Sequence, residues 1–176
     1  MTFERNPLRY LAFLLLGHLS FGLRAEPVPE QDMKAIYTYN FALYTQWPES
    51  DRTHFNICTL NQDEVGLAMR KLEGKRIHGH PVAVVRLSSL DRISDCQILF
   101  IGDRATVNLP RINNLLGSEA VLTVSDTPVQ NSVGIVIVPD GKRLVFDVNL
   151  ERCRQAGLKL SSSLLKLART VVAPPN

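Results

Sequence analysis

The last third of the chain has short apolar runs that give way to a longer hydrophobic period. Ile135–Val138 and Leu144–Val148 are apolar runs separated by a segment with an Asp-Gly step, and this arrangement predicts a β-hairpin. From Asn149 onward, apolar residues recur every three or four positions, as on the buried stripe of an amphipathic helix. The pattern therefore predicts a hairpin followed by one helix that runs to about Val172.

Three features define this expected final helix. Asn149 is a favourable N-cap, and Pro174-Pro175 prevents the helix from continuing. Gly157 lies inside the expected helix and costs roughly 1 kcal/mol relative to Ala. We therefore expect either a bend at Gly157 or close packing against it.

The preceding part of the chain alternates apolar runs with helical periods. The first helix is rich in aromatic residues up to Trp47 and should end at Pro48, and we interpret it as a core helix rather than a ligand-binding aromatic box. The run at residues 97–101 is apolar throughout, as in a strand buried on both faces. The expected strands cover residues 54–60, 82–87, 97–101 and 120–124, and the expected helices begin near residue 31, after Asn61–Asp63 and near Thr106.

This order of elements predicts the fold class. Strands that alternate with helices through short connections favour right-handed crossovers and a parallel sheet. The C-terminal hairpin then adds antiparallel strands on one side. We therefore expect an α/β, three-layer sandwich with a mostly parallel sheet, a C-terminal antiparallel hairpin and flanking helices.

The N-terminus predicts export. Arginines precede an apolar run from Tyr10 to about Leu23, followed by small residues, which is typical of a secretory signal peptide and short for a membrane-spanning helix. We expect residues 1–25 to be this signal peptide and residues 26–176 to form a single domain. Three of the 20 basic residues and one of the 17 acidic residues lie in the leader, so the remaining chain is nearly neutral and offers no basic footprint for nucleic acid.

Export changes the interpretation of the three cysteines. Cys58 lies in the first expected strand and Cys96 just before the third, and these strands are neighbours in a doubly wound sheet, close enough for a disulfide. Two buried thiols, or another pairing, are the alternatives. Cys153 is most simply a small buried apolar residue.

Short polar residues follow two of the expected parallel strands. Asp103, Ser125 and Asp126 lie at the carboxyl ends, where open α/β sheets usually bind ligands, although aspartates also cap turns at such places. His78 and His80 flank a glycine, but no third metal ligand is evident, so we expect loop histidines and no metal. The sequence contains no GxSxG, P-loop or GxGxxG motif, so we expect neither an enzyme nor a bound cofactor.

Three segments together resemble one family of exported proteins. They are the aromatic helix with Tyr-Asn-Phe and Trp-Pro (Lys34–Pro48), the central LTVSD (Leu122–Asp126) and the C-terminal segment that begins FDVNL (Phe146–Ala168). In these segments, in its strand order and in its signal peptide, the chain is similar to the YfiR family. The glycine-rich turn usual after LTVSD is thinner here, at Thr127–Gly134.

The resemblance implies a role and partners. Proteins similar to YfiR are periplasmic inhibitors that bind the sensor domain of an inner-membrane diguanylate cyclase, lower cyclic di-GMP and restrain biofilm formation. An outer-membrane lipoprotein sequesters the inhibitor and releases the cyclase. The resemblance also implies a homodimer and a stabilising disulfide, for which Cys58 and Cys96 are the matching pair.

A binding role requires an exposed surface. The candidates for the partner-binding surface are Arg143, Val145 and Asp147 on the hairpin and Lys159 on the final helix; the alternative is that Val145 is buried and Arg143 only closes the turn. A second hypothesis is a periplasmic small-molecule-binding protein that uses the sheet edge near Asp103, Ser125 and Asp126.

Overall fold

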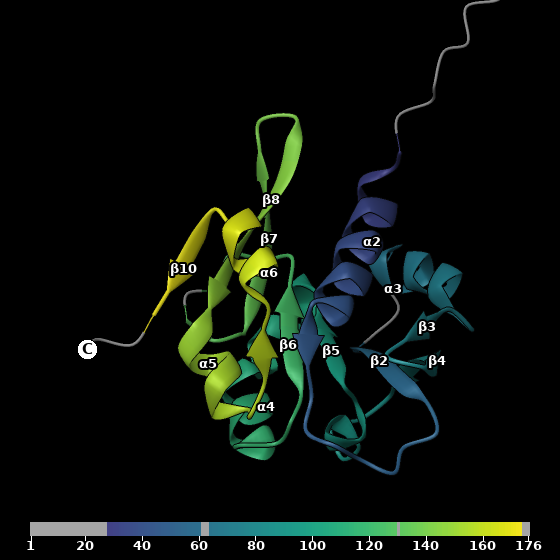
Figure 1. Cartoon of the computed structure of the whole chain (residues 1–176). Coiled ribbons are helices and arrows are strands. Elements are labelled where there is room, and N and C mark those ends of the chain that lie inside the picture. The colour runs from purple at the N-terminus through teal and green to yellow at the C-terminus, as the bar shows by residue number, and fades with distance from the viewer. Residues whose placement is uncertain (1–27, 61–63, 130, 174–176) are drawn as a thin grey trace, which may run out of the picture.

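The computed structural model describes residues 28–60, 64–129 and 131–173 of the 176-residue chain. Within these residues the strands form an eight-stranded sheet in the order β10-β8-β7-β6-β5-β2-β4-β3 and a two-stranded sheet, β1-β9 (Figure 1). The strands are β1 (Thr45–Gln46), β2 (Phe55–Leu60), β3 (Arg76–Ile77), β4 (His80–Leu87), β5 (Ile98–Ile101), β6 (Leu122–Ser125), β7 (Ile135–Asp140), β8 (Arg143–Asn149), β9 (Lys159–Leu160) and β10 (Thr170–Val172).

Helices cover both faces of the large sheet. One hydrophobic cluster joins one face of the sheet to α2, α3, α5 and α6, and a second cluster joins the other face to α4 and short 3₁₀ segments. The helices are α2 (Glu30–Leu43), α3 (Glu64–Met69), α4 (Leu109–Leu116), α5 (Leu150–Gln155) and α6 (Ser162–Leu167), and the 3₁₀ segments are Arg70–Leu72, Ile93–Asp95 and Asp103–Asn108.

The expected fold class is confirmed. Strands β4, β2, β5, β6 and β7 pair in parallel, β10 pairs in parallel with β8, and only the β7–β8 and β3–β4 pairs of the large sheet are antiparallel. Strand β5 is buried along its whole length, as its continuous apolar run predicts. The molecule is an α/β sandwich of two helical layers around a mostly parallel sheet.

The first helix is a core helix, as expected, but it ends earlier than Pro48. Phe41 is buried, and its ring centroid lies 4.9 Å from that of Phe146 on β8, while the Tyr37 hydroxyl donates a hydrogen bond to the Leu144 carbonyl at 2.8 Å. The helix stops at Leu43 because the next residues form β1, which pairs with β9. Tertiary pairing thus overrides a helical pattern that continues in the sequence.

The prediction of one long C-terminal helix is wrong. Gly157 adopts a left-handed φ of 69°, which ends α5 after Gln155 because such a φ is incompatible with a continuing helix. The chain then forms β9, and the Ser161 side chain accepts a hydrogen bond from the Leu164 N–H at 3.2 Å to begin α6. Residues 170–172 form a strand, β10, instead of the last helical turn.

The expected hairpin and its helix cap are both present. Strands β7 and β8 pair antiparallel down to Asp140 and Arg143, with Gly141 in the turn at a φ of 60°. Figure 1 shows this hairpin extending beyond the rest of the sheet. The Asn149 side chain accepts a hydrogen bond from the Arg152 N–H at 2.9 Å, as an N-cap does.

Three sequence predictions lie outside the described residues: the signal peptide at residues 1–25, the helix cap at Asn61–Asp63 and the stop at Pro174-Pro175. In the part of the chain that the structure describes, no helix has the length and apolarity needed to cross a membrane.

Candidate functional site

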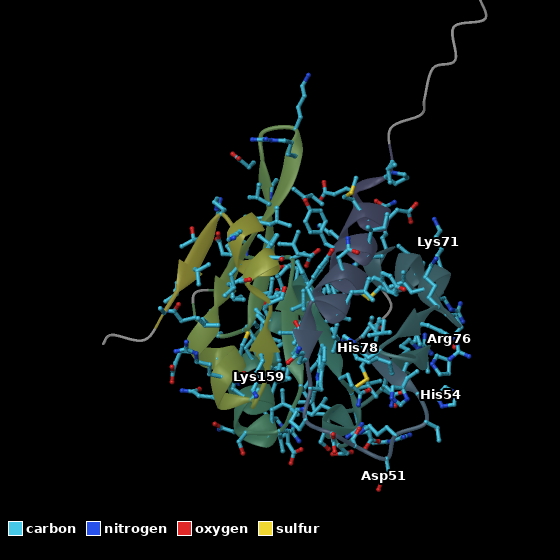
Figure 2. The ribbon with its side chains drawn as sticks, viewed as in Figure 1. Asp51, His54, Lys71, Arg76, His78 and Lys159 are labelled. Atoms are coloured by element: carbon cyan, nitrogen blue, oxygen red, sulfur yellow. A yellow bond between two sulfur atoms is a disulfide. The ribbon has the colours of Figure 1, made fainter. Side chains whose placement is uncertain are left out.

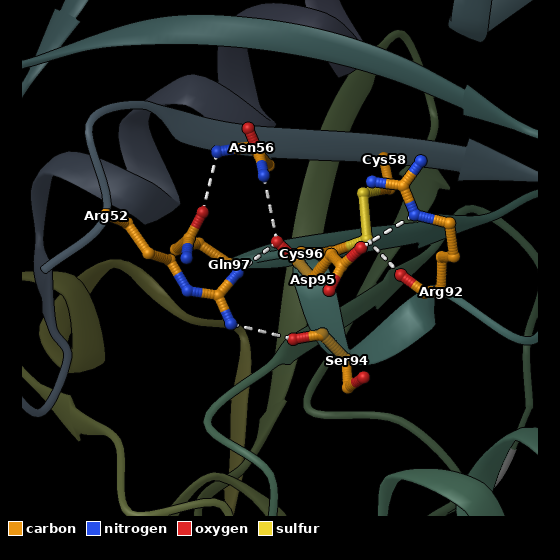
Figure 3. The surroundings of a disulfide bond; sticks show 8 residues. All are labelled: Arg52, Asn56, Cys58, Arg92, Ser94, Asp95, Cys96 and Gln97. Atoms are coloured by element: carbon orange, nitrogen blue, oxygen red, sulfur yellow. Dashed lines mark hydrogen bonds and ion pairs between the residues drawn. A yellow bond between two sulfur atoms is a disulfide. The ribbon is translucent and has the colours of Figure 1, made fainter. Parts of the chain in front are cut away.

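A disulfide joins Cys58 to Cys96, the pairing that the sequence favoured. Cys58 lies within β2 and Cys96 two residues before β5, and their Cα atoms are 5.8 Å apart. Both residues are buried, and hydrogen bonds from Arg52 to the Ser94 and Asp95 carbonyls hold the adjoining segment (Figure 3). The bond therefore fixes the start of β5 against β2.

Cys153 is a buried free thiol, as expected. It lies against Gly134, where an added Cβ would approach its sulfur to 3.1 Å. Burial raises the pKa of the Cys153 thiol to about 12, although the charge of Arg152 opposes this increase. At neutral pH the thiol is protonated, so Cys153 packs as an apolar residue rather than acting as a nucleophile.

The carboxyl edge of the sheet forms a cleft of about 790 Å³. Asp103 and Asp126 both line this cleft, which opens beyond the ends of β5 and β6. Ser125 is fully buried instead: its hydroxyl donates to the Ile101 carbonyl at 2.8 Å and accepts from the Thr127 N–H at 3.2 Å. The structure thus brings together two of the three ligand candidates and places the third within the sheet.

Lys34 is a residue of this cleft that the sequence analysis missed. Its ammonium group lies 2.8 Å from a Glu30 carboxylate oxygen and 2.9 Å from an Asp126 carboxylate oxygen. Burial acts to lower the pKa of Lys34, but the hydrogen bonds and charges of the two carboxylates outweigh it and raise the pKa. The negative charge of Asp126 is therefore paired with the positive charge of Lys34 through Oδ2. The other carboxylate oxygen, Oδ1, is buried without a hydrogen-bond partner.

Three of the four partner-binding candidates lie on one face of the hairpin. Side chains alternate along β8, so Arg143, Val145 and Asp147 point away from the face on which Phe146 packs. Val145 lies opposite Val138 and belongs to neither hydrophobic cluster of the described residues. A groove of about 480 Å³ runs along this side of β7, β8 and β10. We call the set Val136, Val138, Arg143, Val145 and Asp147 the open face.

Asp147 is anchored by an arginine from the C-terminal segment. The Arg169 guanidinium donates to both carboxylate oxygens of Asp147, a fork that bridges β8 and the residue before β10. The hydrogen bond from Arg169 lowers the pKa of Asp147, although partial burial opposes the shift. This ion pair was not foreseen, because the sequence analysis placed Arg169 on a helix.

Lys159 does not join the open face. It lies on β9, which pairs with β1 through Gln46, and its side chain is exposed. Figure 2 places Lys159 near the end of the molecule opposite the hairpin turn.

The loop histidines have a structural role at His78. The residue adopts a left-handed φ of 48° in the β3–β4 turn, and its ring Nε2 lies 3.0 Å from the Ala42 carbonyl and 2.8 Å from the Thr45 carbonyl. The ring thus holds the end of α2 against the turn. Within the described residues, no group of three or more potential protein ligands is arranged to hold a metal ion.

Comparison with protein families matches residues 31–169 to the family described as YfiR/HmsC-like. The match includes α2 from its second residue, every strand of the large sheet except β10, the disulfide and Arg169. This chain belongs to the YfiR/HmsC-like family. The aromatic helix, the LTVSD strand and the C-terminal segment Phe146–Ala168 all lie within the matched residues, and the YfiR/HmsC-like family is a regulatory family.

Among solved structures, this YfiR/HmsC-like chain is similar in fold to a conserved domain protein from Vibrio cholerae, with a TM-score of 0.54, 7% identity, and 81% of this chain and 60% of that chain covered. A second similar structure is the ABC domain in complex with L-Trp from Streptococcus pneumonia, with a TM-score of 0.47, 12% identity, and 67% and 56% covered. The chain thus spans less than two thirds of either structure's length. At these identities the likeness concerns the fold alone.

Proposed function

We propose that this protein is a periplasmic regulator that binds and inhibits an inner-membrane diguanylate cyclase. By this binding it lowers cyclic di-GMP and restrains biofilm formation, and an outer-membrane lipoprotein relieves the inhibition. The observation that carries the proposal is the family match over residues 31–169. The hydrophobic leader of the sequence, typical of export, supports the periplasmic location.

Inhibition by binding has a thermodynamic requirement. A protein shifts the equilibrium of its partner only by binding one conformation more tightly than the other. The regulator must therefore prefer the inactive conformation of the cyclase's periplasmic domain. An ordered binding surface favours tight binding because little conformational entropy is lost on binding.

The open face is the surface that we propose for this contact. The partly exposed Val145 pairs across the strands with the buried Val138, and the exposed guanidinium of Arg143 lies at the rim near the hairpin turn. The fork from Arg169 holds Asp147 in one position. An apolar centre with charged residues around it is the usual composition of a protein–protein contact.

A measurement of intracellular cyclic di-GMP tests the function. The source bacterium is compared with a strain that lacks the gene, and this deletion strain is complemented either with the full gene or with a gene that lacks codons 2–25. We expect deletion to raise cyclic di-GMP and only the full gene to restore the low level. Restoration by the leaderless form would contradict a periplasmic site of action.

Small-molecule binding at the sheet edge is the second candidate function. It is favoured by the cleft of about 790 Å³ that Asp103 and Asp126 line at the carboxyl ends of parallel strands. A ligand for this cleft should raise the melting temperature of the purified protein, because binding to the native state alone stabilises it. The Asp126→Asn variant should lose that increase.

A further inference from the structure

Positive charge is concentrated at the β3 edge of the large sheet. The segment Arg70–Ile77, which forms a 3₁₀ turn and β3, contains two arginines and two lysines but only one acidic residue, Glu73. The chain after the leader is nearly neutral as a whole, so this excess is a local feature. We define the basic edge as the four exposed cations Arg70, Lys71, Lys75 and Arg76.

Backbone hydrogen bonds hold the basic edge against β4. The Val82 N–H donates to the Lys75 carbonyl at 2.7 Å, and the Gly74 N–H donates to the Val82 carbonyl at 3.0 Å. Strand β3 then pairs antiparallel with the start of β4. Figure 2 shows Lys71 and Arg76 on the same side of the molecule, beside β3 and β4. The cations therefore lie along an ordered edge of the sheet.

Carboxylates of this chain compensate only one of the four cations. The Lys71 ammonium lies 2.7 Å from an Asp32 carboxylate oxygen. The Glu73 carboxylate turns to the backbone instead, where it accepts a hydrogen bond from the Val84 N–H at 2.8 Å. In the part of the chain that the structure describes, the remaining three cations of the basic edge form no ion pair. Three positive charges are thus left for an anion from outside.

The basic edge has no apolar centre. Among the described residues, no large hydrophobic side chain from Arg70 to Leu87 is exposed. The nearest exposed one in the preceding sequence, Leu67 on α3, lines the cleft at the carboxyl edge of the sheet. Protein–protein contacts usually have an apolar centre, whereas an anionic lipid surface attracts Lys and Arg by charge. This composition favours lipid headgroups over a protein as the partner.

We propose that the basic edge binds the anionic phospholipid headgroups of a bilayer. The choice of a bilayer rests on the proposed function, which places the protein beside the inner membrane. Each Lys or Arg near an anionic membrane surface strengthens binding about fivefold, so three unpaired cations strengthen it about 100-fold. Binding of this strength is reversible, and it concentrates the protein at the membrane without anchoring it there.

This contact defines how the open face is presented. In the order of the large sheet, β8 lies six strand spacings from β3. Neighbouring strands are about 4.8 Å apart, so β8 lies at most about 29 Å from the basic edge. A sheet that stands on this edge turns both of its faces along the membrane. The open face is then directed toward the periplasmic part of a neighbouring membrane protein.

Sedimentation with lipid vesicles tests the proposal on the purified protein without its leader. The vesicles contain one third phosphatidylglycerol and two thirds phosphatidylcholine, or phosphatidylcholine alone. We expect sedimentation with the anionic vesicles only, and release when salt shortens the Debye length from about 10 Å to about 3 Å. The double variant Arg70→Gln with Lys75→Gln should bind the anionic vesicles about 25-fold more weakly, because two unpaired cations are removed.

The matched control is the double variant Arg154→Gln with Lys166→Gln, on α5 and α6. Both of these residues are exposed, and the control removes one Arg and one Lys, as the test variant does. We expect the control to bind the anionic vesicles like the native protein, and the melting temperature of each variant checks its folding.

Three results would overturn the proposal. They are a native protein that does not sediment with anionic vesicles, equal sedimentation with both kinds of vesicle, and equal losses of binding in the two folded double variants. Vesicle binding that the test variant keeps, together with lost binding to the cyclase's periplasmic domain, would also overturn it and assign the basic edge to a protein partner. Vesicle binding is measured without the cyclase, so its failure is distinguishable from a failure of the cyclic di-GMP test.

Discussion

Both halves of the large sheet are built from strands, but they differ in whether both faces of these strands are covered by other parts of the chain. In the half built from β2, β4 and β5, both faces are covered by hydrophobic clusters and a disulfide joins two of the segments. In the half built from β7, β8 and β10, one face packs on α2, α5 and α6, while the other is the open face beside a groove. In the sequence, β5 of the first half is a continuous apolar run, whereas β8 of the second half carries the charged residues Arg143 and Asp147 on one of its faces.

The covered half should therefore contribute most to stability, and the open face should contribute most to recognition. Side chains of the covered half can contribute to folding on both faces of each strand, so changes there should destabilise the whole protein. On the open face Val138 is buried and Val136 packs against the second cluster, whereas Arg143, Val145 and Asp147 remain available to a partner.

The largest effect should come from the covered half. Phe100 on β5 is fully buried, so Phe100→Ala should cost about 3–5 kcal/mol of unfolding free energy through lost burial and a residual cavity. The matched change on the open face, Val145→Ala, should cost less than about 1 kcal/mol because Val145 lies outside both clusters. Urea unfolding of both variants checks this, and equal losses would break the comparison.

The disulfide should give the next largest effect. It spans 38 residues along the chain, and replacing both Cys58 and Cys96 by Ala should cost about 3–4 kcal/mol in the loop-entropy account. Thermal unfolding of native and variant protein, each with and without reductant, measures this. A native protein whose melting temperature does not respond to reductant would show that the bond does not stabilise the covered half.

The structure of a segment could be predicted from the sequence where its neighbouring residues determine it. It could not be predicted where pairing with a distant part of the chain determines it. The apolar run of β5, the hairpin with its Gly141 turn and the neighbouring positions of Cys58 and Cys96 follow from local pattern and strand order, and the structure has all three. These features do not require knowledge of what packs against them.

The C-terminal segment shows what local pattern cannot decide. Apolar residues keep helical spacing through Leu160 and Leu164, but β9 pairs with β1 more than 100 residues earlier in the chain, and this pairing cannot be read from a window of neighbours. Gly157 was the one available signal of the break. Because the helix was predicted to continue, the strand β10 and the Asp147–Arg169 fork were both missed.

The Gly157 turn gives a smaller predicted effect. A residue with a Cβ is strained at its φ of 69°, so Gly157→Ala should cost about 1–2 kcal/mol. The nearest atom to an added Cβ is the Pro48 Cγ at 3.7 Å, so conformational strain rather than a clash should account for the loss. Chemical denaturation measures it, and a more stable variant would favour the continuous helix that the sequence suggested.

The smallest effect should come from the Asp147–Arg169 pair. Because the pKa of Asp147 is lowered in the folded protein, the pair stabilises the protein above the pKa of Asp147 in the unfolded chain, and this stabilisation is lost as pH falls through the lower, folded-state pKa. Both side chains are partly exposed, so solvent screening keeps the contribution small.

The Asp147→Asn variant sharpens this prediction. It should lower stability slightly at neutral pH and should match the native protein in acid, where the native carboxylate is protonated. NMR titration of the carboxyl carbon of Asp147 gives the folded-state pKa directly. A value at or above the ordinary range for aspartate would contradict the fork described for the open face.

The central claim is that the open face carries the regulatory contact, and cyclic di-GMP in complemented deletion strains tests it most directly. The strains carry the native gene, Arg143→Glu with Val145→Lys on the open face, or the control Leu115→Lys on α4, with each exported protein quantified and its folding checked by melting temperature. We predict that the native and control genes restore low cyclic di-GMP and the open-face variant does not. Full restoration by a folded open-face variant would contradict the account.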